Sequence, residues 1–239
     1  MLSHAYVFFD VDDTLVEYKT HWAEAFAQVA QEAGVDASVD RARAVLNGAF
    51  TGFYEECIGK HAGTGDVHEF WMDYDGHLLA ALGVTRDLRE HTARLEKLLS
   101  APDRIGLFPE VPEVLSDLRA RGARLGIVTG RPLAGPDLER LGIRDYFSFV
   151  VDAFSAGSSK SAGYMFLSAA QAAAAAGLSA WHVGDSYADD VKGAEAAGMR
   201  AVLVDRRAAH PDADCLRITD LRPLPEIIMN GSSHTATPE

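Results

Sequence analysis

An apolar run ends abruptly at a cluster of carboxylates near the start of the chain, in residues 8–15, FFDVDDTL. The stretch 5–9 is short, apolar and β-prone, which is typical of a buried strand in a parallel sheet. Ligands of such sheets gather at the carboxyl ends of the strands. If extended geometry persists, Asp10 and Asp12 point to one side, where their repulsion favours a divalent cation held by oxygen ligands. A solvated turn or a helix N-cap is the alternative explanation of the acidic patch.

A second apolar run, residues 124–128, also stops at polar residues. It ends at Thr129 and Gly130, whose hydroxyl and backbone N–H groups could hold a phosphate oxygen. Both residue types are also common in turns, so this segment alone is weak evidence.

Two later segments add a cation and another carboxylate. Lys160 stands in a polar break before an alanine-rich stretch that predicts a helix over 163–176, and an ordinary surface lysine is its plainer interpretation. A third apolar run, 181–184, stops at Asp185 and leads into a predicted helix of small residues. In that run His182 is expected to be structural.

Together these segments resemble the four ordered motifs of the haloacid dehalogenase superfamily, and its phosphatase branch in particular. The approach to the second motif, residues 108–118, looks like that of phosphoglycolate-phosphatase-like members. The resemblance covers residues 4–17 and 105–206. The matching positions are Asp10-x-Asp12-x-Thr14, Thr129, Lys160, and Gly184-Asp185-Ser186 with Asp190.

The resemblance implies a role for each matching residue. Asp10 is implied to be the nucleophile that attacks phosphorus and becomes an aspartyl phosphate, and Asp12 the general acid and base. Thr129 and Lys160 are implied to act in catalysis by holding the transferring phosphoryl oxygens, with Gly130 contributing to phosphate binding.

The resemblance also implies a Mg²⁺ cofactor. Its protein ligands would be the Asp10 carboxylate, the Asp12 backbone carbonyl and Asp185. Asp190 is expected to orient Lys160 or a metal-bound water. Asp189 could share that role, or either residue could be a plain acid at a helix N-terminus.

Three positions depart from the family pattern. Asp13 stands where many members have glycine, Gly130 where an asparagine often follows the threonine, and Ser161 where proline is frequent. Arg131 either compensates for the missing amide or is simply exposed. The chemistry implied above requires none of the three missing groups.

The expected fold class is α/β, a three-layer Rossmann-like parallel-sheet core with an inserted α-helical cap domain. The core is predicted to comprise residues 1–17 and 105–229, and the cap residues 18–104. The last segment, 230–239, is rich in Ser, Thr and Gly, and we expect a disordered tail there.

The inserted segment predicts helices. Apolar residues recur at helical spacing over 22–33, 45–54, 70–79 and 88–99, while the glycine-rich stretch 59–65 predicts a flexible loop. By resemblance this is a cap that closes over the active site and selects the substrate. Conceivable substrate contacts in it are Lys60, His61 and His77.

Composition indicates the class of partner. The chain has 22 Lys and Arg against 35 Asp and Glu, a net charge of −13, which argues against nucleic acid. Its two cysteines are expected to be reduced thiols. Since no signal segment and no apolar run of membrane-spanning length is found, we expect a cytoplasmic enzyme with no membrane partner that acts on a small phosphorylated metabolite. The oligomeric state stays open.

The sequence therefore predicts a Mg²⁺-dependent phosphatase of small phosphate monoesters. A phosphomutase on the same core stays open, because it depends on a cap that excludes water. Asp12 and Thr14 argue against a 2-haloacid dehalogenase, which needs neither a metal nor an acid two residues after the nucleophile. A receiver-like signalling module keeps its phosphorylated aspartate on a later strand, and an inactive scaffold would be expected to have lost Asp10, Asp12 or Asp185.

Overall fold

The protein divides into two compact units. The computed structural model describes residues 4–49, 52–101, 103–132 and 134–232. One unit, the α/β unit, comprises Met1–Glu17 and Leu107–Glu239, and the other, the helical unit, comprises Tyr18–Gly106. Each unit is described separately below.

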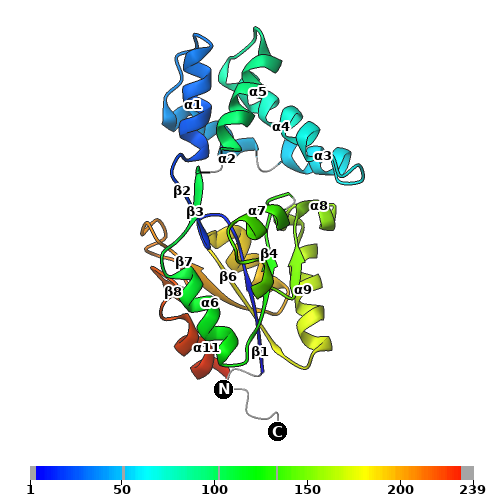
Figure 1. The fold of residues 1–239 in the computed structure, drawn as a ribbon, viewed down its shortest axis with the longest axis vertical. Coiled ribbons are helices and arrows are strands. Elements are labelled where there is room, and N and C mark those ends of the chain that lie inside the picture. Colours follow the sequence, from blue (N-terminus) through cyan, green and yellow to red (C-terminus); the bar gives the residue numbers. More distant parts are fainter. Residues whose placement is uncertain (1–3, 50–51, 102, 133, 233–239) are drawn as a thin grey trace. The chain divides into compact units, whose positions relative to one another are not determined.

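The α/β unit is built on a parallel sheet (Figure 1). Its described residues form six strands in the order β5-β4-β1-β6-β7-β8, and every neighbouring pair is parallel. The central strand β1 therefore has β4 on one side and β6 on the other. The strands are β1 (Ala5–Phe9), β4 (Arg124–Val128), β5 (Phe149–Val151), β6 (Ser179–Gly184), β7 (Arg200–Val204) and β8 (Arg217–Ile218).

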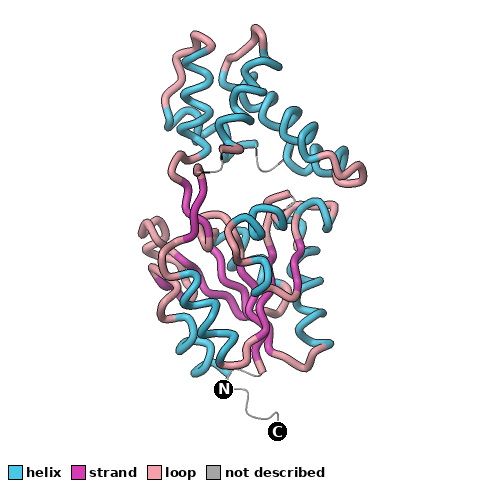
Figure 2. Tube along the Cα trace, viewed as in Figure 1, coloured by secondary structure: helices cyan, strands magenta, loops and turns pink. Residues whose placement is uncertain are grey.

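Helices cover both faces of this sheet (Figure 2). The helix α9 (Tyr164–Ala175) packs on β1, β4, β5 and β6, while α6 (Val111–Ala120) packs on β4 and on α11 (Leu224–Ser232). This arrangement confirms the predicted α/β fold class. The shorter helical segments are α7 (Gly135–Arg140), η1 (Arg144–Tyr146), α8 (Ala153–Ala156), η2 (Lys160–Ala162), η3 (Tyr187–Val191) and α10 (Lys192–Ala196).

Strand β1 shows why a continuous apolar run marks the middle of such a sheet. All five of its residues are buried, since helices or strands surround it on every side. Gly126 of β4 lies opposite Phe8, and a Cβ there would come within 2.6 Å of the Phe8 ring. Glycine at this position therefore leaves room for the ring, which stacks on Tyr6 at a centroid distance of 4.3 Å.

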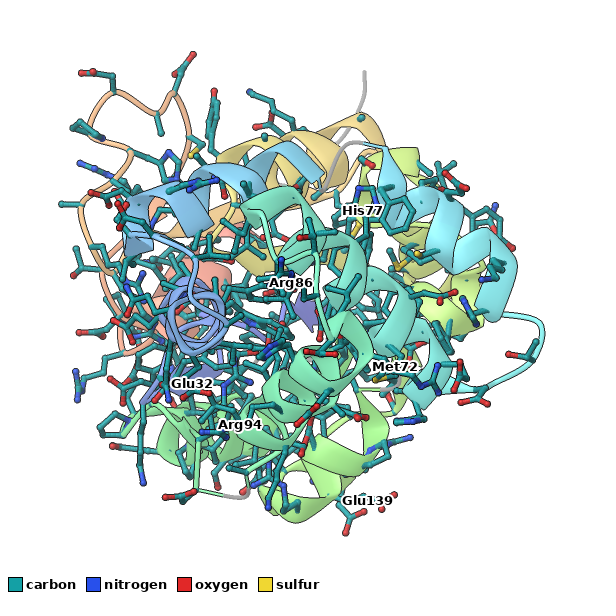
Figure 3. All side chains as sticks on the ribbon, turned by 90° about the horizontal axis from the view of Figure 1, so that it is seen from above. Glu32, Met72, His77, Arg86, Arg94 and Glu139 are labelled. Carbon is teal, nitrogen blue, oxygen red and sulfur yellow. The ribbon has the colours of Figure 1, made fainter. Side chains whose placement is uncertain are left out.

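The helical unit contains α1 (Trp22–Glu32), α2 (Val39–Ala49), α3 (Phe53–His61), α4 (Val67–Leu82) and α5 (Leu88–Leu99). Its surface carries ion pairs between helices. Glu32 of α1 and Arg94 of α5, both labelled in Figure 3, pair at 3.3 Å between Arg94 Nε and Glu32 Oε2.

Two of the helix boundaries predicted in this unit are wrong. The stretch 45–54 is not one helix, because α2 ends at Ala49 and α3 begins at Phe53. Gly52 has backbone angles outside the helical region and serves as the N-cap residue of α3. The predicted loop 59–65 is also shorter than expected, because α3 continues through His61.

The predicted disordered tail also begins too early. Helix α11 extends to Ser232, so residues 230–232 are helical. Arg200 donates a hydrogen bond to the Gly231 carbonyl, and Arg121 pairs with Glu226 at 2.6 Å, so both contacts hold this helix against the rest of the α/β unit. The rest of the predicted tail, residues 233–239, lies outside the described residues.

A separate two-stranded sheet pairs β2 (Val16–Tyr18) with β3 (Ile105–Leu107). Across the ranges that the structure describes, we find no helix with the length and apolar character needed to span a bilayer.

Candidate active site

Three polar residues follow directly on three adjacent strands of the α/β unit. Asp10 follows β1, Thr129 follows β4 and Asp185 follows β6. Phe9 of β1 is in register with the penultimate residues of β4 and β6, Ile127 and Val183. Because parallel strands bring their carboxyl ends to one edge, these residues gather at the place where such sheets bind ligands.

Lys160 joins this group from the segment between α8 and α9. Its ammonium contacts Asp10 Oδ1 and lies 2.7 Å from Asp190 Oδ1. All three side chains are largely buried, with 11% of the Lys160 side chain exposed. Lys160 is thus not the ordinary surface lysine that its sequence surroundings allowed, because it bridges two buried carboxylates.

Asp190 is held in place by three donors. One oxygen accepts hydrogen bonds from Lys160 and from His182 Nε2 at 2.8 Å, and the other accepts one from the Ser186 backbone N–H at 3.0 Å. A Cβ at Gly184 would stand 2.2 Å from the Asp190 carboxyl carbon, so that carboxylate requires glycine there. The structure thus brings Asp190 to Lys160, as the sequence predicts.

His182 takes part in this network, a role that sequence reasoning missed. Its side chain and that of Asp190 are each 1% exposed. Burial lowers the pKa of His182, so the neutral ring donates its Nε2–H to the Asp190 carboxylate. A polar residue inside an apolar strand was the available signal, but its partner lies eight residues further along the chain.

The charges of Lys160 and Asp190 stabilise each other. Burial alone would raise the pKa of Asp190, yet Lys160 and His182 outweigh it and hold that pKa below its ordinary value. Burial alone would lower the pKa of Lys160, but Asp10 and Asp190 outweigh it and raise that pKa. Both groups are therefore ionised at neutral pH.

Asp10 and Asp185 are in the opposite situation. Burial, opposed by Lys160 and reinforced by the neighbouring carboxylates Asp190 and Asp12, raises the pKa of Asp10 to about 7. Burial and the charges of Asp10 and Asp190 raise the pKa of Asp185 to about 9. Both carboxyl groups therefore resist ionisation, because the single lysine does not offset all the negative charge around them.

This donor set fits a hard divalent cation such as Mg²⁺. Carboxylate oxygens of Asp10, Asp185 and Asp190 lie within 4.8 Å of one another. Both oxygens of Asp190 already accept hydrogen bonds, so Asp10 and Asp185 are the better candidates for coordination. Burial and the neighbouring negative charges raise the pKa values of both groups, and a cation between them would offset that charge. The Asp12 backbone carbonyl as a further ligand stays a prediction.

The Asp12 side chain is paired with an arginine. Arg131 Nη1 lies 2.9 Å from Asp12 Oδ1, and the Asp12 side chain is 34% exposed. Arg131 itself is largely buried, so it is not the exposed residue that the sequence left as one possibility.

The remaining predicted residues lie in or near the same loops. Thr129 is buried, and its hydroxyl accepts a hydrogen bond from the Arg131 backbone N–H at 3.2 Å. A Cβ at Gly130 would stand 3.9 Å from the aliphatic stem of Lys160, an ordinary van der Waals distance. Asp189 is exposed, and its carboxylate accepts a hydrogen bond from the Ser186 hydroxyl at 3.4 Å. Of these two neighbouring acids, Asp190 rather than Asp189 contacts Lys160.

The structure also accounts for the departure at Asp13. This residue has φ of 54°, in the left-handed region where glycine is usual and aspartate is among the better tolerated alternatives. Arg207 pairs with its carboxylate at 3.1 Å, and Arg206 donates to its carbonyl at 3.3 Å. These contacts stabilise the loop without glycine.

In the helical unit, the residues named as conceivable substrate contacts interact with their own neighbours. Lys60 and His61 both pair with Asp73. His77, labelled in Figure 3, stacks on Phe53 at a centroid distance of 3.7 Å.

The family model of haloacid dehalogenase-like hydrolases matches residues 5–198. The chain belongs to this family. Among curated proteins, the phosphoserine phosphatase of Thermus thermophilus is 32% identical over 242 residues, covering 89% of this chain and 94% of that protein. The predicted family is thereby confirmed, as is the prediction that the chain is a hydrolase of this family.

Solved structures of this hydrolase family agree with the fold. A 2-haloacid dehalogenase from Pseudomonas syringae is 26% identical, with a TM-score of 0.62 and coverage of 95% of this chain and 99% of that one. A HAD phosphatase from Thermococcus onnurineus is 25% identical, with a TM-score of 0.59 and coverage of 94% and 97%. The fold is thus common to members with two different reactions, so the reaction has to be argued from the site.

Proposed function

We propose that this haloacid dehalogenase-like hydrolase is a Mg²⁺-dependent phosphatase of small phosphate monoesters that works through an aspartyl phosphate on Asp10. One observation carries the proposal. A buried lysine bridges the Asp10 and Asp190 carboxylates at the sheet edge where Asp185 and Thr129 also lie. The phosphatase names of the relatives support the same reaction.

In the first step, one bond to phosphorus forms and one bond to phosphorus breaks. An Asp10 carboxylate oxygen bonds to phosphorus, and the bond from phosphorus to the leaving oxygen breaks, with its electron pair going to that oxygen. Asp12 supplies the proton when the leaving group is an alcohol. Lys160 and the Thr129 hydroxyl stabilise the phosphoryl oxygens. The Thr129 hydroxyl accepts a hydrogen bond from the Arg131 backbone N–H, so its own proton can be donated to a phosphoryl oxygen.

The second step releases phosphate. Asp12, now ionised, takes a proton from a water that attacks phosphorus, and Asp10 leaves as a carboxylate. Bound Mg²⁺ supplies positive charge that offsets the carboxylates and the phosphoryl group. Asp190 and His182 act at a distance, since they hold the Lys160 ammonium beside Asp10.

Asp12 distinguishes a phosphatase from a dehalogenase. Displacing a halide requires no proton donor for the leaving group. It also uses no metal cation that would offset a cluster of buried carboxylates. We propose the helical unit as the cap that selects the substrate, on the strength of its insertion between the first and second motifs.

The direct test measures hydrolysis of p-nitrophenyl phosphate by the purified protein, with Mg²⁺ or with EDTA. We expect turnover with Mg²⁺, loss with EDTA, and loss in an Asp10→Asn variant. Asp13→Asn is the matched control. It replaces a neighbouring carboxylate at a position of positive φ with asparagine, which also tolerates that backbone angle, and this variant should retain activity. Turnover that survives in Asp10→Asn would contradict the proposal, and chloride release from 2-chloropropionate by the same preparation would point to a dehalogenase.

A further inference from the structure

We infer that Arg131 is a positioning residue for Asp12, holding the carboxylate of the acid and base in reach of the reacting oxygen. The inference rests on the proposed function. Arg131 is not one of the residues of the four family motifs, because the second motif is matched by Thr129, two residues earlier.

Arg131 uses two separate nitrogens for two carboxylates. Nη1 lies 2.9 Å from Asp12 Oδ1, and Nη2 contacts Asp137 Oδ2 in the first turn of α7. Charged hydrogen bonds of this kind are short and directional, and the planar guanidinium fixes the angle between its two arms. The Asp12 carboxylate is thereby tied to α7.

The far end of this connection is itself supported. Arg140, one turn along α7, lies 3.0 Å from the other oxygen of Asp137. Arg131 is only 14% exposed, so its ion pairs are less screened than those of a surface arginine. The backbone N–H of the same residue donates to the Thr129 hydroxyl. One residue therefore orients both the predicted phosphate holder and the predicted acid and base.

Burial by itself does not fix the orientation of the Asp12 side chain. Its side chain is one third exposed, and its charge acts on Asp10 with the same sign. Repulsion from Asp10 favours side-chain orientations that turn Asp12 towards solvent, and Arg131 opposes that motion. A general acid must lie within hydrogen-bond reach of its target. The arginine also favours the ionised carboxylate, but the loss of positioning on its removal should outweigh the gain in the protonated form, so proton transfer should suffer in particular.

Leaving-group basicity separates this role from a structural one. Phenyl phosphate and p-nitrophenyl phosphate have nearly the same shape, but phenolate is far more basic and needs a proton as it departs. The value of kcat/KM reports the first step, in which that proton is given. If Arg131 acts through Asp12, its removal should therefore harm phenyl phosphate much more than p-nitrophenyl phosphate.

The experiment compares Arg131→Met and Arg131→Lys with the wild type on both substrates in the presence of Mg²⁺. We expect Arg131→Met to lower kcat/KM about 30-fold for phenyl phosphate and less than about 3-fold for p-nitrophenyl phosphate, a part of the usual general-acid effect. Arg131→Lys should recover part of the loss, since lysine can reach one carboxylate but not hold both. Arg207→Met is the matched control, because Arg207 pairs with Asp13 on the same loop and is exposed.

A second arm places Arg131→Met in an Asp12→Asn background. There we expect no further loss for phenyl phosphate, because residues that act as a unit are not additive. Equal losses on both substrates, a rise in KM with unchanged kcat, or an additive double variant would each overturn the inference. Each of these results requires an active wild type, so failure of the proposed function would be recognised separately as an inactive wild type.

Discussion

Each unit of the protein buries a carboxyl group, and the two groups differ in their partners. Asp190 of the α/β unit accepts hydrogen bonds from Lys160, His182 and a backbone N–H, and it is ionised. Asp75 of α4 is equally buried, yet none of the described residues hydrogen-bonds with its Oδ1. Its pKa lies well above the ordinary value, owing first to burial and then to the charge of Glu96, with Arg104 opposing.

The difference teaches how to interpret a buried acid. Burial without a close cation leaves the neutral form, which is a packing group with one polar atom unsatisfied. Burial beside a cation keeps the charged form, which can orient other charges. A buried carboxylate thus indicates chemistry when a cation and further donors converge on it, as they do on Asp190.

Removing the Lys160 ammonium should have the largest effect on this difference between the two units. Lys160→Met leaves Asp10 and Asp190 facing each other without a counter-charge and removes a donor to the phosphoryl oxygens. We expect kcat/KM for p-nitrophenyl phosphate to fall about 10²- to 10³-fold, the usual cost of losing one such donor. Lys192→Met is the control, because Lys192 is exposed and pairs with Glu195, and its activity should stay near that of the wild type. Wild-type activity in Lys160→Met would contradict the assigned role.

Removing one donor from Asp190 tests the network at a smaller scale. His182→Phe keeps an aromatic ring of similar size but loses the Nε2–H that bonds Asp190. We expect kcat to fall about tenfold with little change in KM, in line with the loss of one hydrogen bond to a charged group. His182→Gln, which retains an N–H donor, should recover part of the rate. A change in KM alone would show that the histidine does not act through Lys160.

Burial of Asp185 and its repulsion by neighbouring carboxyl groups should make the folding stability of the metal-free protein depend on pH. The pKa of Asp185 is about 9 in the folded chain and near 4 in an unfolded one, so the folded state keeps its proton longer. The contribution of Asp185 to the stability of the metal-free protein therefore falls as pH rises from about 4 to about 9. Asp185→Asn should remove this loss and stabilise the metal-free protein by about 1–3 kcal/mol at pH 8, with little effect at pH 4. Thermal unfolding in EDTA at both pH values measures it, and a destabilised variant at pH 8 would contradict the assigned repulsion.

The acid of the helical unit should respond least. Because burial raises the pKa of Asp75 and favours its neutral form, Asp75→Asn replaces the carboxyl group with an uncharged group of the same shape. We expect unfolding free energy to change by less than about 1 kcal/mol, and kcat/KM for p-nitrophenyl phosphate to stay within about twofold. A large loss of activity would place Asp75 in the chemistry and remove the contrast between the units.

Much of the α/β core could be predicted from the sequence. Buried parallel strands are continuous apolar runs, and each run ends at the polar residue that the sheet edge presents, as β1 does at Asp10 and β6 at Asp185. The helix over 163–176 was predicted from the high helix propensity of alanine, and it is present as α9. Local patterns carried both predictions.

The errors and omissions come from contacts that local patterns do not contain. The helix predicted over 45–54 failed because its apolar spacing continues across Gly52, where the backbone leaves the helical region. The link from Arg131 to Asp12 spans 119 positions and depends on β4 lying beside β1, a sheet order that one sequence does not specify. The link from His182 to Asp190 spans only eight positions, but it depends on the path of the turn after β6, which an apolar pattern does not contain.

The central claim is that Asp10 carries the phosphoryl group. The most direct measurement quenches a reaction with p-nitrophenyl phosphate in acid, reduces the protein with borohydride and maps the product by mass spectrometry, since an acyl phosphate on aspartate is reduced to homoserine. We predict homoserine at residue 10, dependent on substrate and Mg²⁺ and absent without either. Reduction at Asp12 or another carboxylate, while the enzyme turns over, would contradict the account.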